Sequence, residues 1–135
     1  MNTFDLFFKE NRNERECYYA EVCNDIKDEK GNVVKWKLRP LSTKEEEEIR
    51  EETTESINGS LKLNMNRYIE KLISASVIYP NLYDASLQDS YKCKTPEDLL
   101  KHIVNVPGEY SALAKLVQEK NGFKSLKDEV DAAKN

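Results

Sequence analysis

One helix must end and another can begin within the stretch Tyr79-Pro80-Asn81-Leu82-Tyr83-Asp84-Ala85-Ser86-Leu87-Gln88-Asp89-Ser90-Tyr91. Pro80 cannot continue a helix, and it pushes the preceding residue, Tyr79, into an extended conformation. Asp84 is a good N-cap for a short helix that presents Leu87 and Tyr91. We therefore predict that one helix ends before Pro80 and that a short helix begins after Asp84.

On the N-terminal side of this stretch, apolar residues at intervals of three and four predict a strong amphipathic helix. Its stripe consists of Leu61, Met65, Tyr68, Ile69, Leu72 and Ser76. Residues 53–60, rich in Ser, Thr, Asn and Gly, are predicted to form a loop. Before that loop, Ser42 and Glu45 make a capping box for a helix that extends to about Glu52 and has one large apolar residue, Ile49.

On the C-terminal side, Thr95-Pro96-Glu97-Asp98 combines a cap, a proline at the first helical position and acids in the first turn. Pro107 ends that helix and opens the next. The stripe of this next helix consists of Tyr110, Leu113, Leu116 and Val117. Asn121-Gly122 ends it, with Phe123 placed to fold back on the last turn, and Ser125 is predicted to start a last short helix.

Two alternating runs predict a β-hairpin over residues 17–40. Its apolar face consists of Tyr18, Ala20 and Val22 in the first strand and of Val34, Trp36 and Leu38 in the second. Gly31 permits the turn between them, and Pro40 ends the second strand because proline has no N–H to donate. We expect Trp36 to be buried, packed against the helix of residues 61–77.

These elements predict a single α+β domain over residues 1–135. It comprises an N-terminal segment (1–16), the hairpin (17–40) and a helical part (41–135) with five or six short helices. In the N-terminal segment, Thr3 is predicted to cap a short helix that carries Phe4, Phe7 and Phe8. Three phenylalanines this near a terminus either dock on the domain or pack between copies, and the residues alone leave both possibilities open.

The composition narrows the class of protein. The 135 residues have a formal net charge of -4, with 39% hydrophobic and 34% charged residues, and no basic stripe. This balance is typical of a helix-rich soluble domain and argues against nucleic-acid binding. The longest apolar run, around residues 73–79, is too short to span a bilayer, and the N-terminus lacks the features of a secretory signal. We therefore expect a cytoplasmic protein.

The three cysteines and the single histidine form no recognisable catalytic or metal-binding pattern. Cys17 and Cys23 would lie in one strand, roughly 20 Å apart, which is too far for a disulfide. Cys93 is in a different segment, and His102 is expected at the surface, where only tertiary packing could pair the two. Zinc-ligand spacing is absent. We predict no catalytic residue, no metal site and no cofactor.

Two further clusters each allow two interpretations. The side chains of Glu45-Glu46-Glu47-Glu48 fan out by about 100° each and cannot converge on one ion. They form either a solvated face or an electrostatic contact with a basic partner. Tyr79, Tyr83 and Tyr91 either form a stacking surface or close the core beside Pro80. The shared spacing of Leu82 and Leu87 favours the second interpretation.

The central stretch also carries a family resemblance. Its pattern Pro-Asn-Leu-x-Asp-x-x-Leu-Gln-x-Ser-Tyr resembles the centre of the XkdN-like tail assembly chaperones of phages and prophages of Gram-positive bacteria. Three pieces agree in order and spacing: Trp36-Lys37-Leu38-Arg39-Pro40-Leu41-Ser42, Gly108-Glu109-Tyr110 and Val130-Asp131-Ala132-Ala133-Lys134-Asn135. The residues expected to shape the structural motif are Trp36, Pro40, Pro80, Leu82, Leu87, Gln88, Tyr91, Gly108 and Tyr110. The chain departs from the family at Lys92, where members often carry glycine.

This resemblance implies a small, non-enzymatic α+β chaperone in the bacterial host cytoplasm. Such a protein is expected to bind the tape measure protein in several copies, to keep it soluble during tail assembly and to be absent from the mature virion. It also implies self-association and a possible frameshifted longer form of the chain. The candidate partner-binding residues are Phe4, Phe7, Phe8, Glu45, Glu46 and Glu48. The alternative is a structural tail or head-completion component that is retained in the virion.

Overall fold

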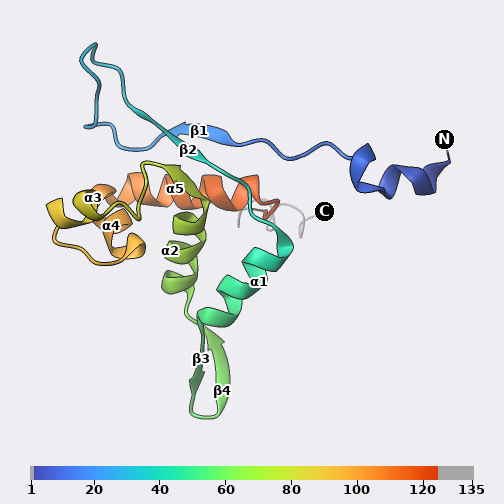
Figure 1. Cartoon of the computed structure of the whole chain (residues 1–135). Helices are drawn as coiled ribbons and strands as arrows, with labels where there is room; N and C mark the ends of the chain where they lie inside the picture. The colour runs from blue at the N-terminus through green and yellow to red at the C-terminus, as the bar shows by residue number, and fades with distance from the viewer. Residues whose placement is uncertain (1, 125–135) are drawn as a thin grey trace, which may run out of the picture.

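The computed structural model describes residues 2–124, and this part of the chain has an α+β fold (Figure 1). A three-stranded antiparallel sheet has the order β1 (Tyr18–Glu21), β2 (Lys35–Leu38), β5 (Val77–Tyr79). The helices are α1 (Thr43–Glu52), α2 (Met65–Ser76), α3 (Ala85–Ser90), α4 (Pro96–Ile103) and α5 (Pro107–Lys120). Helix α2 packs against α1, α4 and α5, and strands β1 and β2 run along one side of α5. The predicted fold class is confirmed.

The first hairpin has the predicted inner face. Ala20 lies opposite Trp36, and Tyr18 lies opposite Leu38. Trp36 is only 2% exposed and Leu38 is fully buried, so period-two alternation identified the buried face correctly. Gly31 has a φ of 85°, the left-handed conformation that glycine adopts without strain. One detail is wrong, because β1 is only four residues long and Cys17 and Cys23 flank it.

The helix boundaries follow the predicted caps. Ser42 and Glu45 form the capping box of α1. Asp84 accepts a hydrogen bond of 2.8 Å from the backbone N–H of Leu87, and Thr95 accepts one of 3.2 Å from Asp98. Pro107 opens α5, which ends at Lys120, as the Asn121-Gly122 pair predicts. The short helix predicted from Ser125 and the motif at Val130–Asn135 lie outside the described residues.

Residues 53–63 correct the prediction of a loop followed by helix. They form a second hairpin, β3 (Thr54–Ile57) and β4 (Ser60–Leu63), in a sheet of its own. Asn58 and Gly59 both have positive φ, 51° and 81°, as a type I′ turn requires. Helix α2 therefore starts at Met65 with Asn64 as its cap, and Leu61, predicted on the helical stripe, is 77% exposed on β4.

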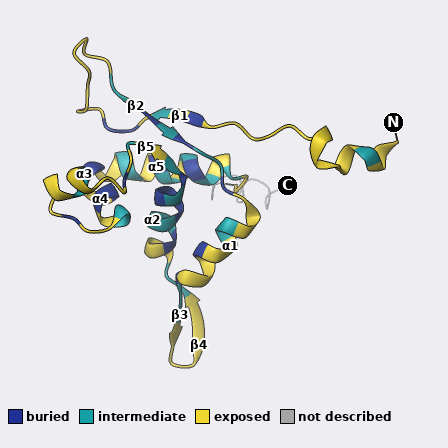
Figure 2. Cartoon of the chain, in the orientation of Figure 1, coloured by how far each residue is buried: buried dark blue, intermediate teal, exposed yellow. Residues whose placement is uncertain are grey.

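The hydrophobic core lies where the sheet meets α2, α4 and α5 (Figure 2). Its most deeply buried apolar residues are Leu38, Leu72, Ile73, Leu82, Leu99, Leu100 and Val117. By contrast, the β3–β4 hairpin and the tip of the β1–β2 hairpin are largely exposed. The core therefore orders one end of each hairpin and leaves the other end in solvent.

The N-terminal residues 2–16, here called the arm, stretch away from this body (Figure 1). The arm contains two short 3₁₀ helices, η1 (Thr3–Phe7) and η2 (Lys9–Asn11). Asn2, and not Thr3 as predicted, caps η1, because its side-chain oxygen accepts a hydrogen bond from the backbone N–H of Asp5 at 3.2 Å. Phe4, Phe7 and Phe8 are all exposed. In this structure they do not dock on the domain.

The signature stretch of residues 80–91 is held together by its own side chains. Leu82 is buried, and the amide of Gln88 donates a hydrogen bond of 2.8 Å to the Leu82 carbonyl. The side-chain oxygen of Asn81 accepts from the backbone of Tyr83 at 3.0 Å. Lys92, where the family often has glycine, has a φ of 58°. Glycine at this position would relieve the strain of the left-handed conformation.

Candidate functional site

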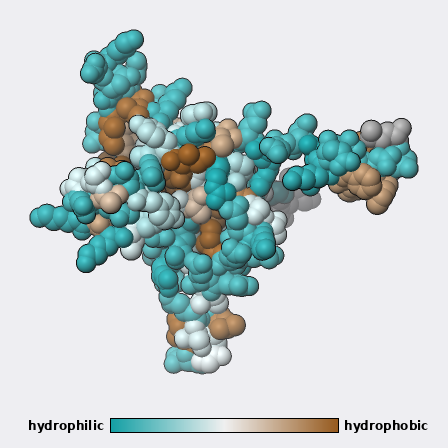
Figure 3. All heavy atoms as spheres, in the orientation of Figure 1, coloured by the Kyte–Doolittle hydropathy of each residue, from teal (hydrophilic) through white to brown (hydrophobic). Residues whose placement is uncertain are grey.

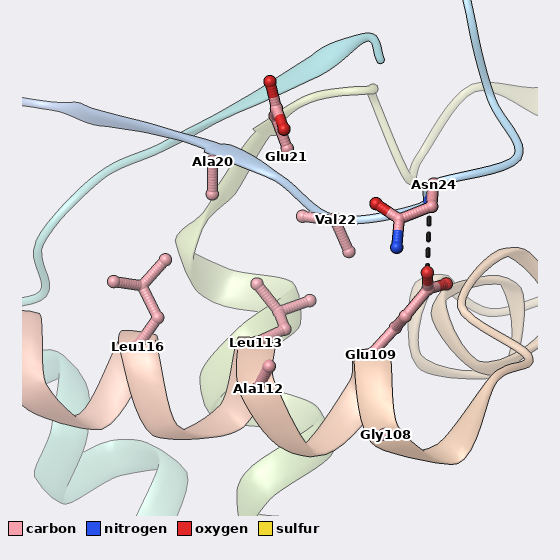
Figure 4. A pocket seen from close by; sticks show the side chains of 9 residues that line it. All are labelled: Ala20, Glu21, Val22, Asn24, Gly108, Glu109, Ala112, Leu113 and Leu116. Atoms are coloured by element: carbon pink, nitrogen blue, oxygen red, sulfur yellow. Dashed lines mark hydrogen bonds between the residues drawn. The ribbon is translucent and has the colours of Figure 1, made fainter.

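A groove of about 280 Å³ lies between strand β1 and helix α5 (Figure 4). We call it the β1–α5 groove, and it is lined by Ala20, Glu21, Val22, Asn24, Gly108, Glu109, Ala112, Leu113 and Leu116. Val22 and Leu113 are buried at its base, and the side chains of Ala20 and Leu116 approach each other from the two walls. The groove therefore has an apolar interior that is open to the surface.

One end of this groove is fixed by a carboxylate. Glu109, in the first turn of α5, accepts a hydrogen bond of 3.1 Å from the backbone N–H of Asn24, just after β1 (Figure 4). A carboxylate in the first turn of a helix also interacts favourably with the helix dipole. The Gly108-Glu109-Tyr110 motif thus connects the end of the first strand to the start of α5, a role that the sequence did not reveal.

The strand that forms one wall has a free edge. In the part of the chain that the structure describes, β1 pairs with β2 alone. An edge strand presents unpaired backbone N–H and C=O groups that can pair with a partner segment. The nine lining residues include no cysteine, serine, histidine or lysine, so they offer no nucleophile with a base. The arrangement suits the binding of a polypeptide.

A second, smaller cavity lies beside the signature stretch. We call it the signature pocket: it has a volume of about 180 Å³ and is lined by Ile26, Val34, Trp36, Tyr79, Pro80, Leu87, Tyr91 and Ile103. Four of the predicted motif residues, Trp36, Pro80, Leu87 and Tyr91, therefore meet at one place. All eight lining side chains are uncharged, and the polar groups among them are the two tyrosine hydroxyls and the indole N–H of Trp36.

The tyrosines of the stretch do not close the core as predicted. Tyr79 is 57% exposed, Tyr83 is 67% exposed and Tyr91 is 38% exposed. The buried member of the stretch is Leu82, which is 1% exposed. Tyr79 and Tyr91 instead border the mouth of the signature pocket, where they enlarge the apolar surface that a ligand would meet.

Two of the acidic partner-binding candidates on α1 already have partners inside the chain. Glu45 accepts hydrogen bonds of 3.1 and 2.6 Å from the Arg39 guanidinium, which lowers the pKa of Glu45 to about 2. Burial opposes ionisation of Glu46, but hydrogen bonds from Arg50 and Tyr68 hold its pKa below the ordinary value. The four acids are thus not a uniformly solvated face. Of the three candidates, Glu48 alone is exposed.

His102 is exposed at the surface, as predicted, and the fold also brings it to Cys93. The Cys93 Sγ and His102 Nδ1 atoms are 3.4 Å apart, and with Asp98 they form a group of potential metal ligands. The same Nδ1 lies 3.0 Å from the Asp98 carbonyl oxygen, which can only accept, and an Nδ1 that donates its proton there has no lone pair for a metal. Burial and Asp98 also raise the pKa of the Cys93 thiol.

A second group of potential ligands, Cys23, Asp25 and Glu109, lies at the end of the β1–α5 groove. Burial raises the pKa of the Cys23 thiol to about 11, and the thiol contacts the Ile103 carbonyl at 3.6 Å. A protonated thiol is a poor ligand. All three cysteines are free. No helix among residues 2–124 combines the length and apolar character that crossing a membrane would require.

Comparisons with known proteins converge on one family. The profile of the family described as "Phage XkdN-like tail assembly chaperone protein, TAC" matches residues 4–134. The chain is 32% identical over 142 residues to the phage-like element PBSX protein XkdN of Bacillus subtilis (strain 168), covering 99% of this chain and 96% of that protein. It is also 32% identical over 114 residues to the uncharacterized protein YqbN of the same organism, covering 80% and 76% of the two chains.

The fold is likewise similar to a solved structure. The crystal structure of the protein YqbN superposes with a TM-score of 0.79 at 22% identity, covering 92% of this chain and 99% of that chain. At that identity the likeness concerns the fold alone.

Proposed function

This chain belongs to the family of phage XkdN-like tail assembly chaperones, and on that premise we propose that it binds the tape measure protein and keeps it soluble during tail morphogenesis. It does so in the host cytoplasm, without catalysis and without a cofactor, and it leaves before the virion is complete. A long chain rich in amphipathic helix exposes apolar stripes that aggregate unless they are covered. A small domain with an open apolar groove can supply that cover.

The β1–α5 groove is the observation that carries this proposal. Its length along α5, from Gly108 to Leu116, corresponds to about two helical turns, which matches the spacing of successive apolar residues on a partner helix. Its interior is apolar, while Glu21 and Glu109 add negative charge at the rim. An amphipathic helix with basic residues beside its apolar stripe fits both features. Glu48, exposed on α1, is a further candidate contact for a basic partner.

Each copy would bind weakly through such a groove, and several copies along one tape measure protein would together hold it in solution. Linked or repeated weak sites raise the overall affinity through the effective concentration of the unbound ones. A frameshifted longer form of the chain would share this domain and its groove. The second candidate function, a structural tail or head-completion component, would require this chain in purified virions at a fixed stoichiometry.

Substitution on the groove wall tests the proposed site. Leu116→Gln removes apolar surface from the groove, whereas Lys115→Gln changes the neighbouring, exposed position on α5. We expect Leu116→Gln to weaken binding to the tape measure protein about tenfold, the loss of roughly 1.4 kcal/mol, and Lys115→Gln to bind like the parent. Thermal melting should show both variants folded. If both variants bind the tape measure protein equally well, the groove is not the binding site.

A further inference from the structure

We propose that the arm of one copy docks through its phenylalanines into the signature pocket of a second copy. This inference deepens the proposed function, since it explains how several copies could line up along one partner. Only the alignment of copies along the partner rests on the proposed function, because the docking itself involves this chain alone. The parts that carry it are the apolar cluster on the arm, the position of the arm and the size of the pocket.

The arm carries a concentrated apolar cluster that the described body leaves uncovered. Phe4, Leu6, Phe7 and Phe8 lie within five residues, and all are exposed. The rings of Phe4 and Phe8 pack against each other edge to face, with centroids 5.4 Å apart. Phe7 is 77% exposed, so its ring is free to enter a cavity. Contiguous exposed apolar side chains of this kind mark an interaction surface, in contrast to single exposed ones.

The arm is ordered by its own hydrogen bonds. The Asn11 side-chain amide donates to the Asp5 carbonyl at 2.6 Å, and Asn2 caps η1. Arg15 ties the base of the arm to the body by donating to the Leu41 carbonyl. Beyond that tie the arm points outward, and its apolar end is separate from the apolar patches of the body (Figures 1 and 3). The arm therefore presents a preformed apolar tip to another molecule.

The signature pocket matches one phenyl ring in size and chemistry. Its volume of about 180 Å³ slightly exceeds that of an engineered cavity of about 150 Å³ that binds benzene. Its lining offers Trp36, Pro80 and Leu87 for contact with a ring. Ile26, Tyr79 and Tyr91 are exposed at its mouth and can pack against the neighbouring Phe4–Phe8 pair. A helix of the tape measure protein suits the longer β1–α5 groove better, whereas this pocket suits a single aromatic side chain.

The arm and the pocket are different surfaces, so their contact is heterologous and runs head to tail. Such a contact adds copies in a row unless the rotation happens to close a ring. A row of copies places their β1–α5 grooves at a regular spacing, as an elongated partner requires. Each arm–pocket contact would be small and reversible, which is compatible with release when the tail tube replaces the chaperone.

Sedimentation velocity over a range of concentrations tests the proposal with full-length protein. The parent should associate as its concentration rises. The arm variant Phe4→Ser/Phe7→Ser/Phe8→Ser should associate at least about thirtyfold more weakly, the loss expected for a buried aromatic anchor. Its control, Lys9→Ser/Arg12→Ser, changes polar residues of the same arm and should behave like the parent. A parent that remains monomeric at all concentrations, or an arm variant that associates like the parent, would overturn the proposal.

The pocket is tested by Ile26→Asp, which places a charge at its mouth in an exposed loop. Asn32→Asp adds the same charge to an exposed position of the same loop and is the control. Ile26→Asp should prevent association, whereas Asn32→Asp should not. Unchanged association of Ile26→Asp would overturn the proposed pocket.

Mixing the two defective variants provides the sharpest result. The arm variant keeps an intact pocket, and Ile26→Asp keeps an intact arm, so together they should form a 1:1 dimer that cannot grow further. Trp36, the only tryptophan, lines the pocket and should change its fluorescence on mixing. A mixture that remains monomeric, with unchanged Trp36 emission, would contradict docking between copies.

Discussion

Replacing Trp36 with alanine should lower the free energy of unfolding by about 3 kcal/mol, near the lower limit of the 3–5 kcal/mol typical of large aromatic residues in cores. Trp36 is 2% exposed and packs inward from β2. The indole also borders the signature pocket, a space of about 180 Å³ where it makes fewer contacts than on its other sides. The variant therefore loses only the contacts on the packed sides of the indole, so the expected loss of stability lies toward the lower limit.

Urea unfolding at 25 °C, followed by circular dichroism, measures this loss. For a domain of this size 1 kcal/mol corresponds to about 3–4 °C in melting temperature, so the variant should melt roughly 10 °C below the parent. Tyr19→Ala is the matched control, because Tyr19 lies on the opposite face of the same sheet and is 63% exposed. Its cost should stay within about 0.5 kcal/mol. If Trp36→Ala melts within a degree or two of the parent, the strand register is wrong.

Three further predictions concern charge, backbone strain and the thiols. Because Arg39 holds the pKa of Glu45 at about 2, below its ordinary 4.5, the stability that Glu45 contributes should be lost as the pH falls between these values. Glu45→Gln should reduce the dependence of stability on pH in this range, whereas Glu47→Gln, at an exposed position, should not. If the parent and both variants show the same pH dependence, the pairing of Glu45 with Arg39 is contradicted. Lys92→Gly should stabilise the fold by about 1 kcal/mol by relieving the φ of 58°, and a lower melting temperature would argue against strain there. Dithiothreitol and EDTA should leave the melting temperature unchanged, since the cysteines are free and the thiol in each group of potential ligands has a raised pKa, which makes it a poor ligand; a drop with either reagent would be contrary evidence.

The sequence was informative wherever a local rule determines the structure. Caps at Ser42, Asp84 and Thr95 and the proline at 107 set the helix starts correctly, because they satisfy or remove specific backbone N–H groups. The end of α2 was predicted less well, because the helix stops at Ser76 and Val77–Tyr79, just before Pro80, form strand β5. The β3–β4 hairpin was missed although a signal existed. Asn58-Gly59 is the dipeptide most typical of a two-residue hairpin turn, but Leu61 and Met65 happen to extend the helical period of α2.

Contacts between segments that lie far apart in the chain could not be predicted from the sequence. The meeting of Cys93 with His102, the pairing of Glu46 with Tyr68 and the assembly of the signature pocket all depend on how helices pack. The β1–α5 groove likewise joins residues about 90 positions apart. Periodicity predicts which face of an element is buried, but it does not predict where two buried faces leave a gap.

Co-expression with the tape measure protein of the same phage is the most direct test of the proposed function. The amount of tape measure protein in the soluble fraction should rise severalfold when this chain is present, and the two should co-purify with several copies of this chain per partner. Leu116→Gln, which alters the β1–α5 groove, should reduce the soluble amount, whereas Lys115→Gln should not. If the tape measure protein is equally soluble without this chain, the chaperone function proposed here is wrong.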